Sequence, residues 1–214
     1  MVGLTLHASI EECLARTTTG IRCVLIGGPS GAGKSTVASL LALRLGCGVL
    51  ELDDFYVDLD HVPEVDIGGE LWPMWDCPEA VDVSLALDTI IAVVLEGRSC
   101  VRVPVYSFQT NTRSGTKWLA VPGGQHLIVE GALAHLLREG CTADGIPNLA
   151  MYVDAEWDLR LRRIRERDRS QPRRALESEH VDASRLLAMA TGEQRWILPM
   201  RAEADIVVRS ESSP

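Results

Sequence analysis

Lysine is nearly absent from this chain of 214 residues, occurring only at positions 34 and 117. The sequence also lacks an apolar run that could span a bilayer and an N-terminal signal-peptide pattern, so we expect a cytoplasmic protein without a membrane partner. Its six cysteines include no pair at CxxC spacing, which favours reduced structural thiols over disulfides or a zinc site. A formal net charge of −9 argues against general nucleic-acid binding.

Short apolar, β-branched runs alternate with longer amphipathic segments along the chain. The pattern predicts buried strands at 22–28, 48–54, 125–131, 148–154 and 204–208, and helices at 34–46 and 80–97. The runs 101–108 and 117–122 flank a polar turn and predict a two-stranded excursion at about 100–122. Such alternation indicates an α/β fold with a mostly parallel sheet between helices. We expect one domain over residues 1–214, with a disordered tail at 209–214.

The stretch IGGPSGAGKST at 26–36 contains the complete pattern GxxxxGK[ST]. Glycines let backbone N–H groups turn inward around phosphate oxygens, and the following helix directs the positive end of its dipole at the same anion. Lys34 is expected to reach the β- and γ-phosphates, and Ser35 to complete the coordination of Mg²⁺. A glycine-rich turn without a ligand would not explain why one of only two lysines stands here. The expected ATP-binding residues of the loop are Gly28, Ser30, Gly31, Ala32, Gly33, Lys34, Ser35 and Thr36.

Two carboxylates stand at the ends of predicted strands, where open α/β sheets bind their ligands. Asp53 can accept the proton of an attacking hydroxyl or help to hold Mg²⁺. A solvated acidic loop that continues to Glu70 is the alternative for this residue. Glu130 emerges from an apolar strand and therefore needs a cation or water, for which Mg²⁺ beside Ser35 is the obvious candidate. A carboxylate that caps the following helix is the alternative there.

Arginine is concentrated between residues 160 and 174. A helix in this segment would present a cationic face and an apolar stripe, formed respectively by Arg160, Arg163 and Arg167 and by Trp157, Leu161 and Ile164. An arginine-rich helical lid at about 156–178, which closes onto transferred phosphates, would have this pattern. A solvated helix with intrahelical ion pairs also fits the pattern. An RNA-binding arm fits less well, because aromatic residues are not interleaved with the arginines.

Taken in order, the motifs resemble the uridine kinase and phosphoribulokinase group of P-loop kinases, and the uridine kinases most closely. The resemblance runs from about residue 22 to 208 and rests on GGPSGAGKST, LDDFYVD, WDCPEAVD, VPVYSF followed by NTR, LIVEGALA, MYVDAEWDLRLRRIRERD and LPMRAEADIVV. It implies a P-loop NTPase three-layer sandwich. It also implies an ATP-dependent kinase that uses Mg²⁺ and phosphorylates the 5′-hydroxyl of uridine or cytidine.

The resemblance also implies roles for single residues. Asp53, Lys34 and Arg167 would be catalytic, with Asp53 as the base, and Arg163 and Arg167 would contact ATP from the lid. Mg²⁺ would be held by Ser35, Glu130 and Asp53. Asp76 would bind ribose hydroxyls, and Tyr106 and Phe108 would hold the pyrimidine ring. The implied acceptor-binding residues are Asp53, Tyr56, Asp76, Tyr106, Phe108, Asn111 and Arg174.

Several departures from the family pattern concern the acceptor. Asn111 stands where uridine kinases usually have histidine, and the lid reads QPRR at 171–174 in place of ERGR. Phosphoryl transfer is therefore better supported than uridine as the acceptor, and a kinase resembling phosphoribulokinase or pantothenate kinase stays open. Two other classes also stay open. One is a regulatory ATPase with a protein partner, and the other is a nucleoside sensor without catalysis. Assembly into a homo-oligomer is compatible with all of them.

Overall fold

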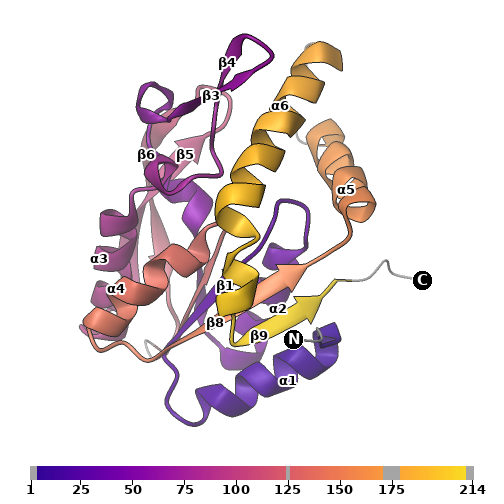
Figure 1. Cartoon of the computed structure of the whole chain (residues 1–214). Helices are drawn as coiled ribbons and strands as arrows, with labels where there is room; N and C mark the ends of the chain where they lie inside the picture. The colour runs from indigo at the N-terminus through magenta and orange to yellow at the C-terminus, as the bar shows by residue number, and fades with distance from the viewer. Residues whose placement is uncertain (1–3, 124–125, 171–178, 211–214) are drawn as a thin grey trace.

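A parallel sheet of five strands, in the order β2-β7-β1-β8-β9, forms the centre of the protein (Figure 1). The structure is a computed structural model that describes residues 4–123, 126–170 and 179–210. The strands are β1 (Cys23–Gly27), β2 (Gly48–Glu51), β7 (Leu127–Glu130), β8 (Asn148–Asp154) and β9 (Ile206–Arg209). Four of them lie inside the predicted segments, and β9 extends one residue past its segment. The parallel pairing confirms the predicted α/β fold class.

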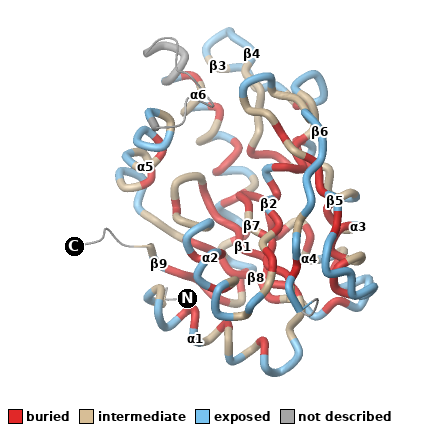
Figure 2. Tube along the Cα trace, turned by 180° about the vertical axis from the view of Figure 1, so that it is seen from behind, coloured by how far each residue is buried: buried red, intermediate tan, exposed pale blue. Residues whose placement is uncertain are grey.

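Both faces of the sheet are covered by helices, which explains why its strands read as nearly continuous apolar runs. In β1, Val24 and Ile26 face one apolar layer, and Cys23 and Leu25 face the other. The first layer includes α1 (Leu6–Thr17) and α2 (Lys34–Leu45), and the second includes α3 (Val83–Val94) and α4 (Leu137–Ala143). Figure 2 shows the buried residues concentrated in the sheet and on the inward sides of these helices.

The helices differ from expectation in several places. Helix α1 was not predicted, and it begins after Thr5, whose side chain accepts a hydrogen bond from the backbone N–H of Ala8. Helix α3 is shorter than the predicted helix at 80–97, because Asp82 caps it by accepting a hydrogen bond from the N–H of Leu85 (3.1 Å). Among the described residues, the short 3₁₀ turns include η1 (Leu52–Phe55), η2 (Leu59–His61), η3 (Pro78–Ala80) and η4 (Ala134–Leu136).

Two hairpins stand outside the central sheet. The antiparallel pair of β5 (Cys100–Ser107) and β6 (Thr112–Ala120) occupies the segment where an excursion was expected. Strand β6 begins earlier than predicted, because most of its side chains face solvent and give no apolar signal. The second hairpin, β3 (Glu64–Ile67) and β4 (Glu70–Pro73), was not predicted and lies in the acidic stretch for which a solvated loop was the alternative.

The C-terminal part contains two helices that lie side by side, α5 (Trp157–Ser170) and α6 (Glu179–Gly192) (Figures 1 and 2). Helix α6 continues into a π-helical turn, η6 (Glu193–Ile197), and then into α7 (Met200–Glu203). Helix α6 also contacts both strands of the β3–β4 hairpin. The predicted lid thus includes α5, whereas its continuation at 171–178 lies outside the described residues.

The structure corrects the prediction for Arg160, which was assigned to the cationic face of the lid helix. Arg160 is only 2% exposed, and its guanidinium donates hydrogen bonds to both carboxylate oxygens of Glu193, at 2.7 and 2.9 Å. The guanidinium also lies 4.9 Å from the ring centre of Trp157. Arg160 therefore fixes α5 to the turn η6 and takes no part in a cationic surface.

Arg160→Met should lower the free energy of unfolding by about 3–5 kcal/mol, because it leaves the Glu193 carboxylate buried without its cation. Arg160→Met/Glu193→Leu should recover most of that loss, since no charge is then left unpaired. Urea unfolding of the wild type and both variants measures the effect. A loss below about 1 kcal/mol for the single variant, as for an exposed pair, would contradict it.

The end of the described chain also differs from expectation. Arg209 is the last residue of β9, and the N–H of Ser210 donates a hydrogen bond to the carbonyl of Asp154 (2.8 Å). The expected disordered tail therefore does not begin at 209, and residues 211–214 lie outside the described residues. Among the helices that the structure describes, none is both long and apolar enough to cross a bilayer.

Candidate active site

The loop between β1 and α2 forms a tight turn at the carboxyl end of the sheet, and its conformation depends on glycine. Gly28 has a φ of 133°, and a Cβ there would lie 2.4 Å from the carbonyl oxygen of Val153. Gly31 has a φ of 77°, and a Cβ there would lie 2.7 Å from the carbonyl oxygen of Arg160. Because glycine has no Cβ at these two positions, β8 and α5 can pack directly against the loop.

Helix α2 presents its N-terminus to this loop. Gly33 is its left-handed N-cap (φ 103°) and has no side chain to cap the helix. The first N–H groups of α2 therefore point at the space in front of the loop, together with the positive end of the helix dipole. Lys34, the first residue of α2, donates a hydrogen bond from Nζ to the carbonyl of Pro29 (3.0 Å).

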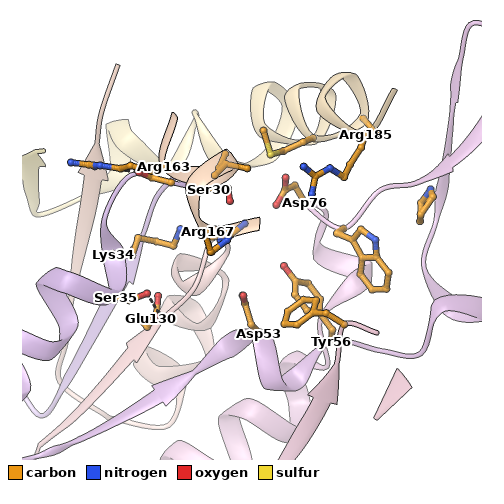
Figure 3. A pocket seen from close by; sticks show the side chains of 18 of the residues that line it. Ser30, Lys34, Ser35, Asp53, Tyr56, Asp76, Glu130, Arg163, Arg167 and Arg185 are labelled. Atoms are coloured by element: carbon orange, nitrogen blue, oxygen red, sulfur yellow. Dashed lines mark hydrogen bonds between the residues drawn. The ribbon is translucent and has the colours of Figure 1, made fainter. Parts of the chain in front are cut away.

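Charged groups from three elements meet beside Lys34. Ser35 donates a hydrogen bond from Oγ to Oε1 of Glu130 at 2.9 Å (Figure 3). Burial raises the pKa of Glu130, although Lys34 opposes this effect. Burial likewise lowers the pKa of the Lys34 ammonium, with Glu130, Asp53 and Asp76 acting in the opposite direction. Each charge of this group is thus partly compensated by its neighbours.

The same residues fit a magnesium ion. A hydroxyl from Ser35 and the carboxylates of Glu130 and Asp53 are hard oxygen donors, which Mg²⁺ prefers. Within the described ranges no three histidine, cysteine or acidic side chains gather as a metal cage. Mg²⁺ is usually bound by one or two carboxylates together with substrate phosphates, so it does not require such a cage. A cation would also stabilise the half-buried Glu130 carboxylate, whose pKa is raised by burial.

A cleft of about 700 Å³ runs from the loop to a group of aromatic side chains. The predicted site residues that line it are Ser30, Gly31, Gly33, Lys34, Ser35, Thr36, Asp53, Tyr56, Asp76, Phe108, Asn111, Glu130, Arg163 and Arg167. Figure 3 shows Asp53 between the Ser35–Glu130 pair and Tyr56, with its carboxylate directed into the cleft. Asp53 belongs to η1, which begins where β2 ends.

The aromatic group consists of Tyr56, Trp75, Tyr106 and Phe108, whose rings meet edge to face. Tyr56 lies 5.4 Å from Trp75, and Tyr106 lies 5.2 Å from Phe108, between ring centres. Tyr106 is 6% exposed and is not among the residues that line the cleft. It packs against the other three rings, and the direct contact with the pyrimidine ring implied for it stays a prediction.

Two polar residues complete this end of the cleft. Asp76 is 9% exposed, and Gly192 packs so closely against it that a Cβ would lie 2.7 Å from its carbonyl oxygen. Asn111 forms part of the turn between β5 and β6, where its φ is 52°. Its carbonyl accepts a hydrogen bond from the N–H of Leu59 (3.0 Å). Asparagine and histidine both tolerate this left-handed conformation, so the turn is compatible with either residue.

The predicted lid arginines differ in what they contact. Arg163 donates from Nη1 to the carbonyls of Gly31 and Ala32 (3.3 Å each) and to Oγ of Ser210 (3.0 Å). It therefore stabilises the loop and also lines the cleft. Arg167 lines the cleft, and its Nε lies 3.4 Å from Oδ1 of Asp168. The predicted residue Arg174 lies outside the described residues.

Sequence reasoning missed one wall of the cleft. Arg185, Ala188 and Met189 of α6 line it, at the i, i+3 and i+4 spacing of one helical face. Nη2 of Arg185 lies 2.9 Å from Oδ2 of Asp168, so this carboxylate lies between a cleft arginine of α5 and one of α6. Trp72 and Trp75 flank the expected acceptor segment, where walls of the pocket were one interpretation of them, and both line the cleft.

Comparisons with known proteins agree with this geometry. The family model "Phosphoribulokinase / Uridine kinase family" matches residues 23–213. Uridine kinase of Escherichia coli (strain K12) is 31% identical over 196 residues, which cover 87% of each chain. Uridine-cytidine kinase-like 1 of Mus musculus is 30% identical over 186 residues, which cover 86% of this chain but only 32% of the mouse protein.

Solved structures support the fold. A chain described as a possible uridine kinase from Bacillus stearothermophilus superposes with a TM-score of 0.54 over 95% of this chain and 98% of that one, at 19% identity. The family model spans most of the chain, and the curated relatives are phosphotransferases that act on an alcohol group. The same catalytic class is therefore assigned to this chain. This chain therefore belongs to the phosphoribulokinase/uridine kinase family and is a kinase.

Proposed function

We propose that this kinase transfers the γ-phosphoryl group of ATP to the 5′-hydroxyl of a pyrimidine nucleoside, uridine or cytidine. The position of Asp53 carries the proposal. It lies in one cleft between the phosphate-binding loop and the aromatic group of Tyr56, Trp75 and Phe108. A carboxylate there is placed to meet a hydroxyl whose ring rests on the aromatic side and whose target phosphate rests on the loop. The names of the curated relatives support the same acceptor.

In the proposed reaction, the loop N–H groups and the Lys34 ammonium hold the β- and γ-phosphates. Ser35 and Glu130 hold Mg²⁺, which supplies positive charge to the phosphate oxygens. Asp53 accepts the hydroxyl proton while the acceptor oxygen bonds to the γ-phosphorus. The bond from that phosphorus to the bridging oxygen breaks, and the bridging oxygen leaves with ADP. Arg167, on the lid at about 156–178, neutralises charge on the transferred group.

For the acceptor, the ring edges of Tyr56, Trp75 and Phe108 offer an apolar wall, and Asp76 and Asn111 offer polar contacts. A carboxylate such as Asp76 suits vicinal hydroxyls, as in a ribose. Arg185 introduces a cation on the same side and favours a second candidate, a sugar phosphate whose anionic group would meet this arginine.

An acceptor panel tests the proposal. ADP release from MgATP is measured with uridine, cytidine, purine nucleosides, ribulose 5-phosphate and pantothenate. We expect turnover with the two pyrimidine nucleosides at a kcat/KM at least about tenfold above every other compound. If ribulose 5-phosphate alone were turned over, the acceptor would be assigned as a sugar phosphate and not as a nucleoside. Turnover with none of them would contradict the proposed acceptor class.

Glu130 should give the activity a pH dependence that responds to Mg²⁺. Burial raises its pKa, and the protonated acid is a poor metal ligand, so activity should fall as the pH drops through that raised value. Because the proton and Mg²⁺ compete for the same carboxylate, higher free Mg²⁺ should move this acid limb to lower pH. The measurement is kcat/KM for MgATP against pH at low and high Mg²⁺. Glu130→Gln, which cannot titrate, is the control and should lose the shift.

A further inference from the structure

The second of the two lysines contacts the residue beside Asp53. Lys117 lies in β6, and its Nζ is 2.6 Å from Oδ2 of Asp54 and 3.6 Å from Oε2 of Glu51. The Asp54 side chain is only 12% exposed, whereas that of Lys117 is 45% exposed. A nearly buried carboxylate is thus met by a cation that approaches it from the protein surface.

Both oxygens of Asp54 bind the β5–β6 hairpin. While Oδ2 meets Lys117 of β6, Oδ1 accepts a hydrogen bond from the backbone N–H of Tyr106 in β5 (3.4 Å). Asp53 and Asp54 are consecutive residues of the turn η1, but their side chains have different roles. Asp53 lines the cleft, and Asp54 ties the turn to the hairpin.

A second cation holds the later part of the same segment. Arg113 of β6 donates from Nε to the carbonyl of Tyr56 (3.0 Å) and from Nη2 to the carbonyl of Phe55 (3.1 Å). Its backbone N–H donates to Oδ1 of Asp58 (2.7 Å). The last residue of η1 and the segment after it therefore stay attached to the hairpin when Lys117 is changed, and a Lys117 variant should fold.

We propose that Lys117 is a positioning residue for phosphoryl transfer. Through Asp54 it fixes the turn η1, and thereby the Asp53 carboxylate, relative to the hairpin that carries Phe108 and Asn111. The inference rests on the proposed function in assigning the acceptor proton to Asp53. Its physical basis is that a catalytic group displaced by a fraction of an ångström loses alignment with the attacking oxygen.

Lys117→Met removes the charge and keeps most of the apolar stem. We expect kcat to fall by roughly 10- to 100-fold, while KM for MgATP stays within about twofold, because the phosphate-binding loop is untouched. Lys117→Arg, which keeps a cation, should retain most of the activity. Lys117→Met/Asp54→Asn should recover part of kcat, since it leaves no unpaired buried carboxylate, and the double-mutant cycle measures the coupling.

Amide hydrogen exchange gives a readout that does not depend on the acceptor. In Lys117→Met, exchange should become several-fold faster in peptides covering 52–58 and 104–108, and stay unchanged in 23–27 of β1. Unchanged exchange at 52–58 and 104–108 would overturn the positioning role, as would faster exchange with an unchanged kcat. A wild-type protein that phosphorylates no acceptor would instead overturn the proposed function, and exchange alone would then decide whether Lys117 fixes the turn.

Discussion

Asp53→Asn should lower kcat for phosphoryl transfer by roughly 10²- to 10⁴-fold and leave the affinity for MgATP close to that of the wild type. Asparagine has nearly the shape of aspartate and keeps an oxygen that can orient the acceptor hydroxyl, but it does not accept the proton. Because Asp53 lies in η1, apart from the loop and α2, the phosphate contacts should persist. Steady-state kinetics and MgATP titration by calorimetry measure the two quantities.

Asp60→Asn is the matched control for this prediction. It makes the same chemical change in η2, where the Asp60 side chain is 76% exposed and pairs with His61. Its kcat should equal that of the wild type. If Asp53→Asn instead weakened MgATP binding more than about tenfold, Asp53 would be assigned to the metal. A kcat within about threefold of the wild type would remove Asp53 from the mechanism altogether.

Lys34→Ala should reduce kcat/KM for MgATP by roughly 10³-fold. Lys34 is a cation placed among Glu130, Asp53 and Asp76, and without it the phosphates would lose a positive charge beside these three carboxylates. Lys34→Arg should rescue little, because a planar guanidinium cannot replace a compact ammonium inside the tight loop. Initial rates over a range of MgATP concentrations provide the measurement.

Arg44→Ala serves as the control for Lys34. It also removes a cation from α2, but at the far end of the helix, where the Arg44 side chain is 52% exposed and pairs with Glu11 of α1. Activity should be unchanged in this variant. Should Lys34→Ala keep more than about a tenth of the wild-type rate, the loop would not be the site where the reacting phosphates are bound.

The sequence predicted best those features that local patterns determine. The strand–loop–helix unit of β1, the loop and α2 appeared where the apolar run, the glycines and the amphipathic period placed it. Glu130 was found because a carboxylate at the end of an apolar strand is a local anomaly. Asp53 was found in a similar way, since it lies two residues past the end of β2.

Features set by distant contacts could not be predicted in this way. Arg160 was assigned to the wrong face, because the sequence does not show that Glu193, 33 residues further on, lies opposite it. Arg185 was missed because only the docking of α6 beside α5 turns that side chain toward the cleft. The β3–β4 hairpin was missed because each strand has only four residues and none of their side chains is buried, so the short alternation in β3 gave little signal.

The pair of Lys117 and Asp54 illustrates the same limit. Lysine is rare in the chain, which marked Lys34 at once because a recognised pattern surrounds it. Lys117 stands in no such pattern, and its partner lies 63 positions earlier in the chain. Only the pairing of β5 with β6 and the packing of the hairpin on η1 bring the two together. A rare residue thus identified a site from sequence only where a motif accompanied it.

The fate of the γ-phosphoryl group tests the central claim most directly. MgATP labelled at the γ-position is incubated with the wild type or Lys34→Ala and a pyrimidine nucleoside, and the products are separated. The account predicts label in the nucleoside 5′-monophosphate, in an amount equal to the ADP formed, and no label there with Lys34→Ala. Label that accumulates only as inorganic phosphate, at a rate no acceptor changes, would contradict it and would indicate a nucleotide hydrolase instead.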